Sequence, residues 1–114
     1  MNEHRKTAHV SFAAARGMGP PTDGNLAVPV FSSGSLEVEL YSPQDVDTQQ
    51  PHSRDEIYIV ARGDGVFFDG EAWQRVSSGS FVFVPAGQEH RFEDFSDDFA
   101  VWVIFYGPEG GESG

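Results

Sequence analysis

A histidine and a glutamate in the middle of this 114-residue chain have the types and spacing that chemistry needs. His52 and Glu56 are four residues apart, so in an extended strand their side chains share one face with those of Gln50 and Tyr58. Two isoleucines occupy the alternate positions and would face the other way. Imidazole and carboxylate groups transfer protons or hold metal ions, and they are rarely buried without such a purpose. The alternative for this stretch is a polar stripe that faces solvent.

A second stretch with chemical potential covers residues 79–94. An apolar run over residues 81–84 leads into a Pro-x-Gly turn, and His90 follows the turn closely. Such a turn would bring His90 back beside the interior of a folded sheet. Taken alone, this stretch is only a turn followed by a polar residue.

The elements that must position these groups are predicted to be strands. Residues 36–41 alternate between apolar and polar side chains, which is typical of a half-buried strand. Further β-branched and aromatic runs, separated by glycine and proline turns, cover residues 57–60, 66–68, 81–84, 91–93 and 100–106. Asp69-Gly70 between two apolar stretches predicts a hairpin with a type I′ turn. No segment has a helical apolar period, so we expect an all-β sandwich or barrel.

The ends of the chain differ in composition from this central region. Residues 1–25 are polar at the start and rich in glycine and proline later, so we expect a flexible N-terminal arm. A single domain is expected over residues 26–106, and residues 107–114 are expected to form a flexible tail. His4 and His9 fall in or beside the arm and are expected to face solvent.

Charge and composition exclude several classes of partner. The net charge is −11, with 18 acidic and 7 basic side chains, so polyanions such as nucleic acid and anionic membrane surfaces are repelled. The chain has no cysteine, and therefore no disulfide or thiolate site. Its first twenty residues lack the apolar run of a signal peptide, and no stretch is long enough for a membrane helix. We expect a cytoplasmic protein.

Together, the two stretches resemble the sequence motifs of the cupin superfamily. The first motif is written as glycine, five residues, His-x-His, three or four residues, glutamate, six residues, glycine. Here His52 matches its second histidine, Glu56 its glutamate and Gly63 its last glycine. The second motif is glycine, five residues, Pro-x-Gly, two residues, histidine, three residues, asparagine. Its positions hold Gly79, Pro85, Gly87, His90 and, in place of the asparagine, Asp94.

This resemblance covers about residues 36–106 and implies a jelly-roll barrel with a metal site inside its mouth. It also implies a homodimer formed through edge strands or the N-terminal arm. Two positions depart from the family pattern. Gln50 replaces the first histidine, and Gln44 replaces the leading glycine of the first motif.

The ligand set implied for one divalent metal is His52, Glu56 and His90, with the amide oxygen of Gln50 as an optional fourth ligand. Two histidines and one carboxylate with open positions resemble the facial triad of non-haem iron(II) oxygenases. Iron, manganese, nickel, zinc and copper all remain open as the metal. A barrel that has lost its metal and keeps the histidines as pocket walls is the alternative.

Four further side chains are candidates for contact with a substrate. Tyr58 shares its face with Glu56, so its phenol could orient a substrate or donate a proton. Phe92 shares its parity with His90 and could form an apolar wall. Arg54 could face the pocket by the same reasoning, although it lies in a motif spacer. Trp102 belongs to a strand that is apolar at every position, so its facing is undecided.

Two classes of function follow from these residues. The first is a metal-dependent enzyme on a small organic molecule, by dioxygenation or, as the weaker option, isomerisation of a sugar-like compound. No arginine is clearly directed inward, so an uncharged or weakly charged substrate is favoured over a phosphorylated one. The second is a non-catalytic module that binds or senses a small ligand, because a fold does not dictate a function.

Overall fold

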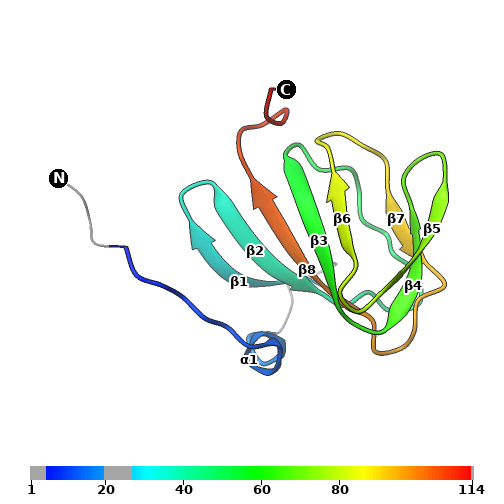
Figure 1. Cartoon of the computed structure of the whole chain (residues 1–114), viewed down its shortest axis with the longest axis horizontal. Helices are drawn as coiled ribbons and strands as arrows, with labels where there is room; N and C mark the ends of the chain where they lie inside the picture. Colours follow the sequence, from blue (N-terminus) through cyan, green and yellow to red (C-terminus); the bar gives the residue numbers. More distant parts are fainter. Residues whose placement is uncertain (1–4, 20–26, 114) are drawn as a thin grey trace.

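The computed structural model describes residues 5–19 and 27–113. Within these residues a short helix precedes a series of strands (Figure 1). The elements are α1 (Phe12–Arg16), β1 (Ala27–Ser33), β2 (Leu36–Tyr41), β3 (Asp55–Arg62), β4 (Asp64–Phe68), β5 (Trp73–Ser77), β6 (Phe81–Val84), β7 (Arg91–Glu93) and β8 (Ala100–Tyr106).

The strands form two antiparallel sheets that enclose one core (Figure 1). The large sheet has the order β1-β2-β8-β3-β6, and the small sheet has the order β5-β4-β7. The large sheet contributes Tyr58, Val60 and Val101 to the core, and the small sheet contributes Phe67 and Phe92. The prediction of a single all-β domain is confirmed.

Each run that was predicted to be a strand is one, and β1 and β5 add to them. The hairpin at Asp69-Gly70 also exists, because β4 pairs with β5. The type I′ prediction is wrong, since Gly70 has a positive φ of 100° but Asp69 is not among the non-glycine residues with positive φ. Instead, the carboxylate of Asp69 accepts hydrogen bonds from the amides of Glu71 and Ala72 and closes a four-residue loop.

Two motif positions owe their residue type to the backbone. Gly63, between β3 and β4, has φ of 82°, and a Cβ atom there would lie 2.9 Å from the Cα of Phe99. Asp94, which stands at the asparagine position of the second motif, has φ of 48°. Aspartate and asparagine adopt this left-handed conformation more readily than other side chains.

The N-terminal region contains an element that the sequence did not predict. Of the expected arm, residues 1–4 and 20–25 lie outside the described residues. Helix α1 begins after Ser11, whose hydroxyl accepts a hydrogen bond from the amide of Ala14. Ala15 is fully buried against Leu40 and Ala100, on the outer face of the large sheet. Five residues are too few to give a helical period in the sequence. No helix in the described part of the chain is long and apolar enough to cross a membrane.

The described residues after β8 are held against the start of β3. The amide of Gly110 donates to the carbonyl of Ser53 at 2.6 Å, and the amide of Glu112 donates to Asp55 Oδ2 at 3.0 Å. Asp55 also accepts from the amide of Ala86 at 2.9 Å. These two bonds, first from Glu112 and then from Ala86, lower the pKa of Asp55. Asp55 therefore links the C-terminal segment and the β6–β7 turn to β3.

Candidate metal centre

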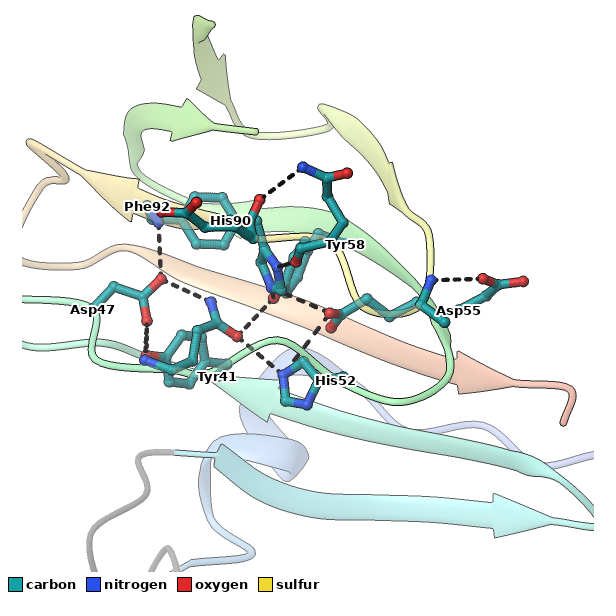
Figure 2. Close-up of polar contacts among 12 residues, drawn as sticks. Tyr41, Asp47, His52, Asp55, Tyr58, His90 and Phe92 are labelled. Carbon is teal, nitrogen blue, oxygen red and sulfur yellow. Dashed lines mark hydrogen bonds and ion pairs between the residues drawn. The ribbon is translucent and has the colours of Figure 1, made fainter. Parts of the chain in front are cut away.

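The two histidines and the glutamate that the sequence singled out meet inside the barrel. His52 and His90 lie close together, with 5.8 Å between their ring centroids (Figure 2). His52 lies in the segment before β3, Glu56 is the second residue of β3, and His90 directly precedes β7. Glu56 Oε1 is 3.2 Å from His90 Nε2 and 3.8 Å from His52 Nε2. One ligand atom from each residue falls within 4.8 Å of the others. A single ion can therefore reach all three.

Glu56 provides the test of whether a metal fits. Its side chain is 1 % exposed, and neither carboxylate oxygen has a hydrogen-bond partner among the described residues. A buried carboxylate without hydrogen bonds is costly, by several kcal/mol when isolated. Among the described residues, its ion-pair partners are the two imidazoles, which carry charge only when protonated. A divalent cation would supply the missing partner, so the residues present fit a metal ion.

The ring of His90 is oriented by a backbone carbonyl two residues earlier in the chain. Its Nδ1 lies 2.8 Å from the carbonyl oxygen of Gln88, so Nδ1–H donates there and Nε2 is left free towards Glu56. Burial tends to lower the pKa of His90, but the close contact of its Nε2 with the Glu56 carboxylate, the Gln88 carbonyl and the charge of Asp47 outweigh it and raise this pKa. Because metal ligation needs the neutral imidazole, an ion bound here would compete with a proton for Nε2.

The amide that reaches the cluster belongs to Gln49. Its Oε1 lies 2.8 Å from the hydroxyl of Tyr58 and 3.3 Å from His52 Nε2. Its side-chain amide nitrogen donates to Asp47 Oδ2 at 2.7 Å, which fixes the oxygen towards the cluster. Gln50, the predicted optional ligand, is exposed, and none of the hydrogen bonds found in the described residues involves its side chain. The parity argument fails for Gln50 because regular strand structure begins only at Asp55.

Asp47 anchors this arrangement, and no pattern in the sequence predicted that role. It is 5 % exposed and accepts hydrogen bonds from the hydroxyl of Tyr41 at 2.5 Å and from the backbone amide of Phe92 at 2.8 Å. It also accepts from the backbone amide of Gln49 at 3.2 Å. The segment before β3 is thus held to the edge strand β7 by a side chain rather than by a strand ladder.

Tyr58 and Phe92 lie where the sequence placed them, on the interior face. Tyr58 is fully buried, and its hydroxyl lies 2.9 Å from His90 Nε2 as well as near Gln49. Burial, followed by the charges of Glu56 and Asp47, raises the pKa of Tyr58 well above its usual range. The phenol therefore stays protonated and can donate. Phe92 packs edge-on against the Tyr58 ring with a centroid separation of 4.9 Å.

Arg54 and Trp102 lie away from the cluster. Arg54 donates to the carbonyl of Gly107 and the carboxylate of Glu37, and it also contacts the carbonyl of Ser35. It thereby joins the β1–β2 hairpin to the end of β8. Trp102 packs against Leu40 and α1 on the outer face of the large sheet. Neither residue lies at the cluster, and a substrate-binding role for them stays a prediction.

The interior near the cluster is acidic and aromatic. On β2, Glu39 lies on the same face of the sheet as Tyr58, because both residues pair with Val103 of β8. Burial, followed by the charges of Glu37 and Glu56, raises the pKa of Glu39. Phe105 packs edge-on against His52 at 5.0 Å between ring centroids. Among the described residues, no arginine or lysine forms an ion pair with Glu56 or Glu39.

This all-β barrel, with its cluster of two histidines and a glutamate, belongs to a well-populated class of proteins. Residues 37–106 match the family model described as the cupin domain. The match covers more than half of the chain, so the chain belongs to the cupin domain family.

Individual relatives agree with this assignment. An uncharacterized protein of Streptomyces coelicolor is 43 % identical over 77 residues, which cover 66 % of this chain and 73 % of that protein. A cupin-2 domain protein of Shewanella frigidimarina superposes with a TM-score of 0.68 at 14 % identity, covering 86 % of this chain and 94 % of that one. A structure of DMSP lyases superposes with a TM-score of 0.58 at 22 % identity, covering 68 % of this chain and 41 % of that one. At these identities the solved structures show the fold alone.

Proposed function

We propose that this cupin binds one divalent transition metal through His52, Glu56 and His90 and acts as a metal-dependent enzyme on a small, uncharged organic molecule. The observation that carries this proposal is Glu56, which is buried between two imidazoles with both oxygens unpaired. A buried, unpaired carboxylate destabilises the fold, and a bound cation would remove that cost. Gln49 Oε1 is proposed as the fourth ligand or as the acceptor that positions Tyr58.

The chemistry supplied by a bound metal would be Lewis-acid polarisation of a substrate oxygen or, with a redox-active ion, activation of dioxygen. The protein's own contribution is a neutral phenol at the metal site. Tyr58 has one proton and two acceptors, Gln49 Oε1 and His90 Nε2. When Nε2 of His90 is engaged as a ligand, the hydroxyl keeps Gln49 as an acceptor and can exchange it for a substrate oxygen. Tyr58 would then orient the substrate or donate its proton.

The charges of the barrel select against anionic substrates. Three of the four arginines of the barrel are engaged elsewhere: Arg54 with Glu37, Arg62 with the Phe12 ring, and Arg91 with Glu93. The fourth, Arg75, is exposed on β5, a strand that carries none of the cluster residues. Glu39 adds a carboxyl group on the interior face instead. A phosphosugar is therefore disfavoured. Oxygenation of a neutral compound is the reaction to test first, because two histidines and one carboxylate form the ligand set of non-haem iron(II) oxygenases.

Metal content tests the proposal most directly. Elemental analysis of untagged protein, never exposed to chelator, is expected to find one equivalent of a first-row metal in the wild type. The double variant His52→Ala, His90→Ala is expected to lose it, whereas the control His9→Ala, at an exposed position, is expected to keep it. A saturating metal should also raise the free energy of unfolding, by about 2.7 kcal/mol at a hundredfold excess over its Kd.

The identity of the metal then chooses the assay. With iron, oxygen uptake is measured against a panel of diketones, phenols and thiols. A metal that binds without any turnover, together with stabilisation by a metabolite that is not consumed, would favour the non-catalytic binding module. No metal in the wild type, even after anaerobic reconstitution, would refute the proposed centre.

A further inference from the structure

The segment that carries His52 depends on contacts from elsewhere in the chain. Residues 49–54 form no strand, whereas the other two candidate ligands lie in or directly before one. Two backbone hydrogen bonds reach this segment from distant residues. The amide of Gly87 donates to the carbonyl of His52 at 2.7 Å, and the amide of Gly110 donates to the carbonyl of Ser53 at 2.6 Å. Ordering an irregular segment costs conformational entropy, so such outside contacts set the position of its ligand.

Residues 107–112, which follow β8, supply most of these contacts. They fold back at the end of the sheet where β3 begins (Figure 1). In addition to the backbone bond, Ser53 Oγ donates to Glu109 Oε2 at 2.9 Å. Arg54 Nε donates to the carbonyl of Gly107 at 3.0 Å. Both residues that follow the histidine are therefore bound to the C-terminal segment.

Asp55 joins the C-terminal segment to the turn that precedes His90. Its Oδ2 accepts from the amide of Glu112 at 3.0 Å, and its Oδ1 accepts from the amide of Ala86 at 2.9 Å. Asp55 is 6 % exposed and directly precedes Glu56 in the chain. One buried carboxylate thus connects the C-terminal segment with the start of β3 and with the Pro-x-Gly turn.

Two consecutive glycines allow the C-terminal segment to approach this carboxylate. Gly110 and Gly111 have φ of 86° and 90°, in the left-handed region that residues with a Cβ atom rarely adopt. A Cβ atom on Gly111 would lie 2.7 Å from Asp55 Oδ1, whereas a Cβ atom on Gly110 would have nothing within 4 Å. The backbone at Gly111 therefore packs directly against Asp55.

We propose that residues 107–112 form a C-terminal clasp that positions His52 in the metal centre. The clasp binds the three residues that follow His52 in the chain. The side chain of His52 is 35 % exposed, so without the clasp its ring is free to turn towards solvent. A ligand that is already ordered loses less entropy when an ion binds, so the clasp raises metal affinity. Its effect on affinity rests on the proposed function of the site.

Titration with Co²⁺, followed by its visible absorption, measures the effect of the clasp on the metal centre. Deletion of residues 109–114 should weaken Co²⁺ binding by about 10–100-fold, as loss of a group that orients a ligand does. The control is the double variant Glu109→Gln, Glu112→Gln. It removes the same side-chain charges but keeps the backbone of the clasp, so it should bind Co²⁺ about as tightly as the wild type. Equal affinities of the deletion variant and the wild type would overturn the proposal.

A pair of glycine variants tests the contact with Asp55 in the full chain. Gly111→Ala and Gly110→Ala both place a Cβ atom at a similar positive φ, so the two variants share the same backbone cost. Only Gly111→Ala also sets a methyl group against the carboxylate of Asp55. It should bind Co²⁺ about tenfold more weakly than Gly110→Ala does. Equal affinities of these two variants would contradict the clasp.

Hydrogen exchange of the metal-free protein separates the clasp from the proposed function. The amide of Gly87 reports on the segment before β3, because its acceptor is the carbonyl of His52. In the deletion variant this amide should exchange about tenfold faster or more, while the amides between β3 and β8 keep their wild-type rates. Unchanged exchange at Gly87, or an equal change at all amides, would overturn the clasp. A wild type that binds no Co²⁺ would refute the metal centre, and exchange at Gly87 would still test the clasp.

Discussion

Replacement of Asp47 by asparagine tests the anchor of the metal centre. Oδ1 of Asp47 accepts hydrogen bonds from the hydroxyl of Tyr41 and the amide of Gln49, and Oδ2 accepts from the side chain of Gln49 and the amide of Phe92. All four groups are donors towards a carboxylate. An asparagine of the same shape turns one of its two oxygens into an NH₂ group, which faces donors and cannot accept from them.

The asparagine can place its NH₂ group at either oxygen position, and the orientation that loses fewer hydrogen bonds sets the change in the free energy of unfolding. If its NH₂ group takes the place of Oδ1, the hydroxyl of Tyr41 can rotate and accept, but the amide of Gln49 loses its partner. A lost hydrogen bond to a charged group costs about 1.5–3 kcal/mol, and removal of a buried charge returns part of that cost. We expect Asp47→Asn to lower the free energy of unfolding by about 2 kcal/mol. For a domain of this size that corresponds to about 8 °C in Tm.

The same variant should weaken the metal centre. Without the carboxylate, the amide of Gln49 is free to turn its oxygen away from Tyr58 and His52. Loss of a residue that orients a metal site lowers affinity by about 10–100-fold. Thermal unfolding of metal-free protein and titration with the metal measure the two effects separately.

The matched control is Asp45→Asn, in the same segment. Asp45 is exposed and has φ of 62°, a conformation that asparagine tolerates well, so its variant should stay within about 0.5 kcal/mol of the wild type. If the Asp47 and Asp45 variants unfold alike and bind metal alike, the anchoring role of Asp47 is wrong.

Three further changes have defined outcomes. Gly63→Ala should lower the free energy of unfolding in denaturant by about 1–3 kcal/mol, because φ is 82° and an added Cβ would lie 2.9 Å from the Cα of Phe99. The control Gly34→Ala, whose added Cβ would have nothing within 4 Å, should cost less. Equal losses in the two variants would contradict this reasoning. Tyr58→Phe should lower turnover by about 10²–10⁴-fold with little change in metal affinity, and a matching loss of affinity would remove its role as a proton donor. The pKa of Asp69 is lowered from 3.8 by the amides of its turn, so its contribution to stability is present above pH 3.8 and is lost as pH falls through the folded pKa. Asp69→Asn should flatten that part of the stability profile, measured by urea unfolding against pH.

The three candidate ligands could be singled out because they fall on two short motifs that resemble those of the cupin superfamily. His52 and Glu56 are separated by one short spacer, and His90 follows a Pro-x-Gly turn that fixes where the chain returns. The alternation along residues 57–60 also sufficed to place Tyr58 inward, and the structure shows it fully buried. Within one strand, facing depends only on the two-residue repeat.

The two-residue repeat does not predict side-chain direction where the chain forms no regular strand. Residues 42–54 contain no regular strand, so parity could not decide between Gln49 and Gln50. Asp45 and Asp47 are the same residue type in the same segment, yet Asp47 is buried and Asp45 is exposed to solvent. Asp47 is buried because it accepts hydrogen bonds from Tyr41 of β2 and from Phe92 of β7, and Phe92 is 45 residues away in the chain.

The sequence also cannot predict which face of a sheet a side chain occupies where the strand is apolar on both faces. Strand β8 reads as one continuous apolar run, so only its registers with β2 and β3 put Trp102 on the outer face and Val103 inside. The spacer residue Arg54 could have pointed either way. It turns outward because Glu37 and two backbone carbonyls lie there as partners.

The sequence by itself determined the all-β class, most of the strands and the three residues of the candidate metal centre, because these depend on two-residue alternation, turn chemistry and short fixed motif spacings. Only the tertiary structure decided which amide lies at the cluster, which acid anchors the segment before β3 and which aromatic rings remain outside the core. Those choices depend on pairing between strands that are far apart in the chain. Glu56 illustrates both levels: its spacing marked it as a ligand, but only packing against the barrel left it buried and unpaired.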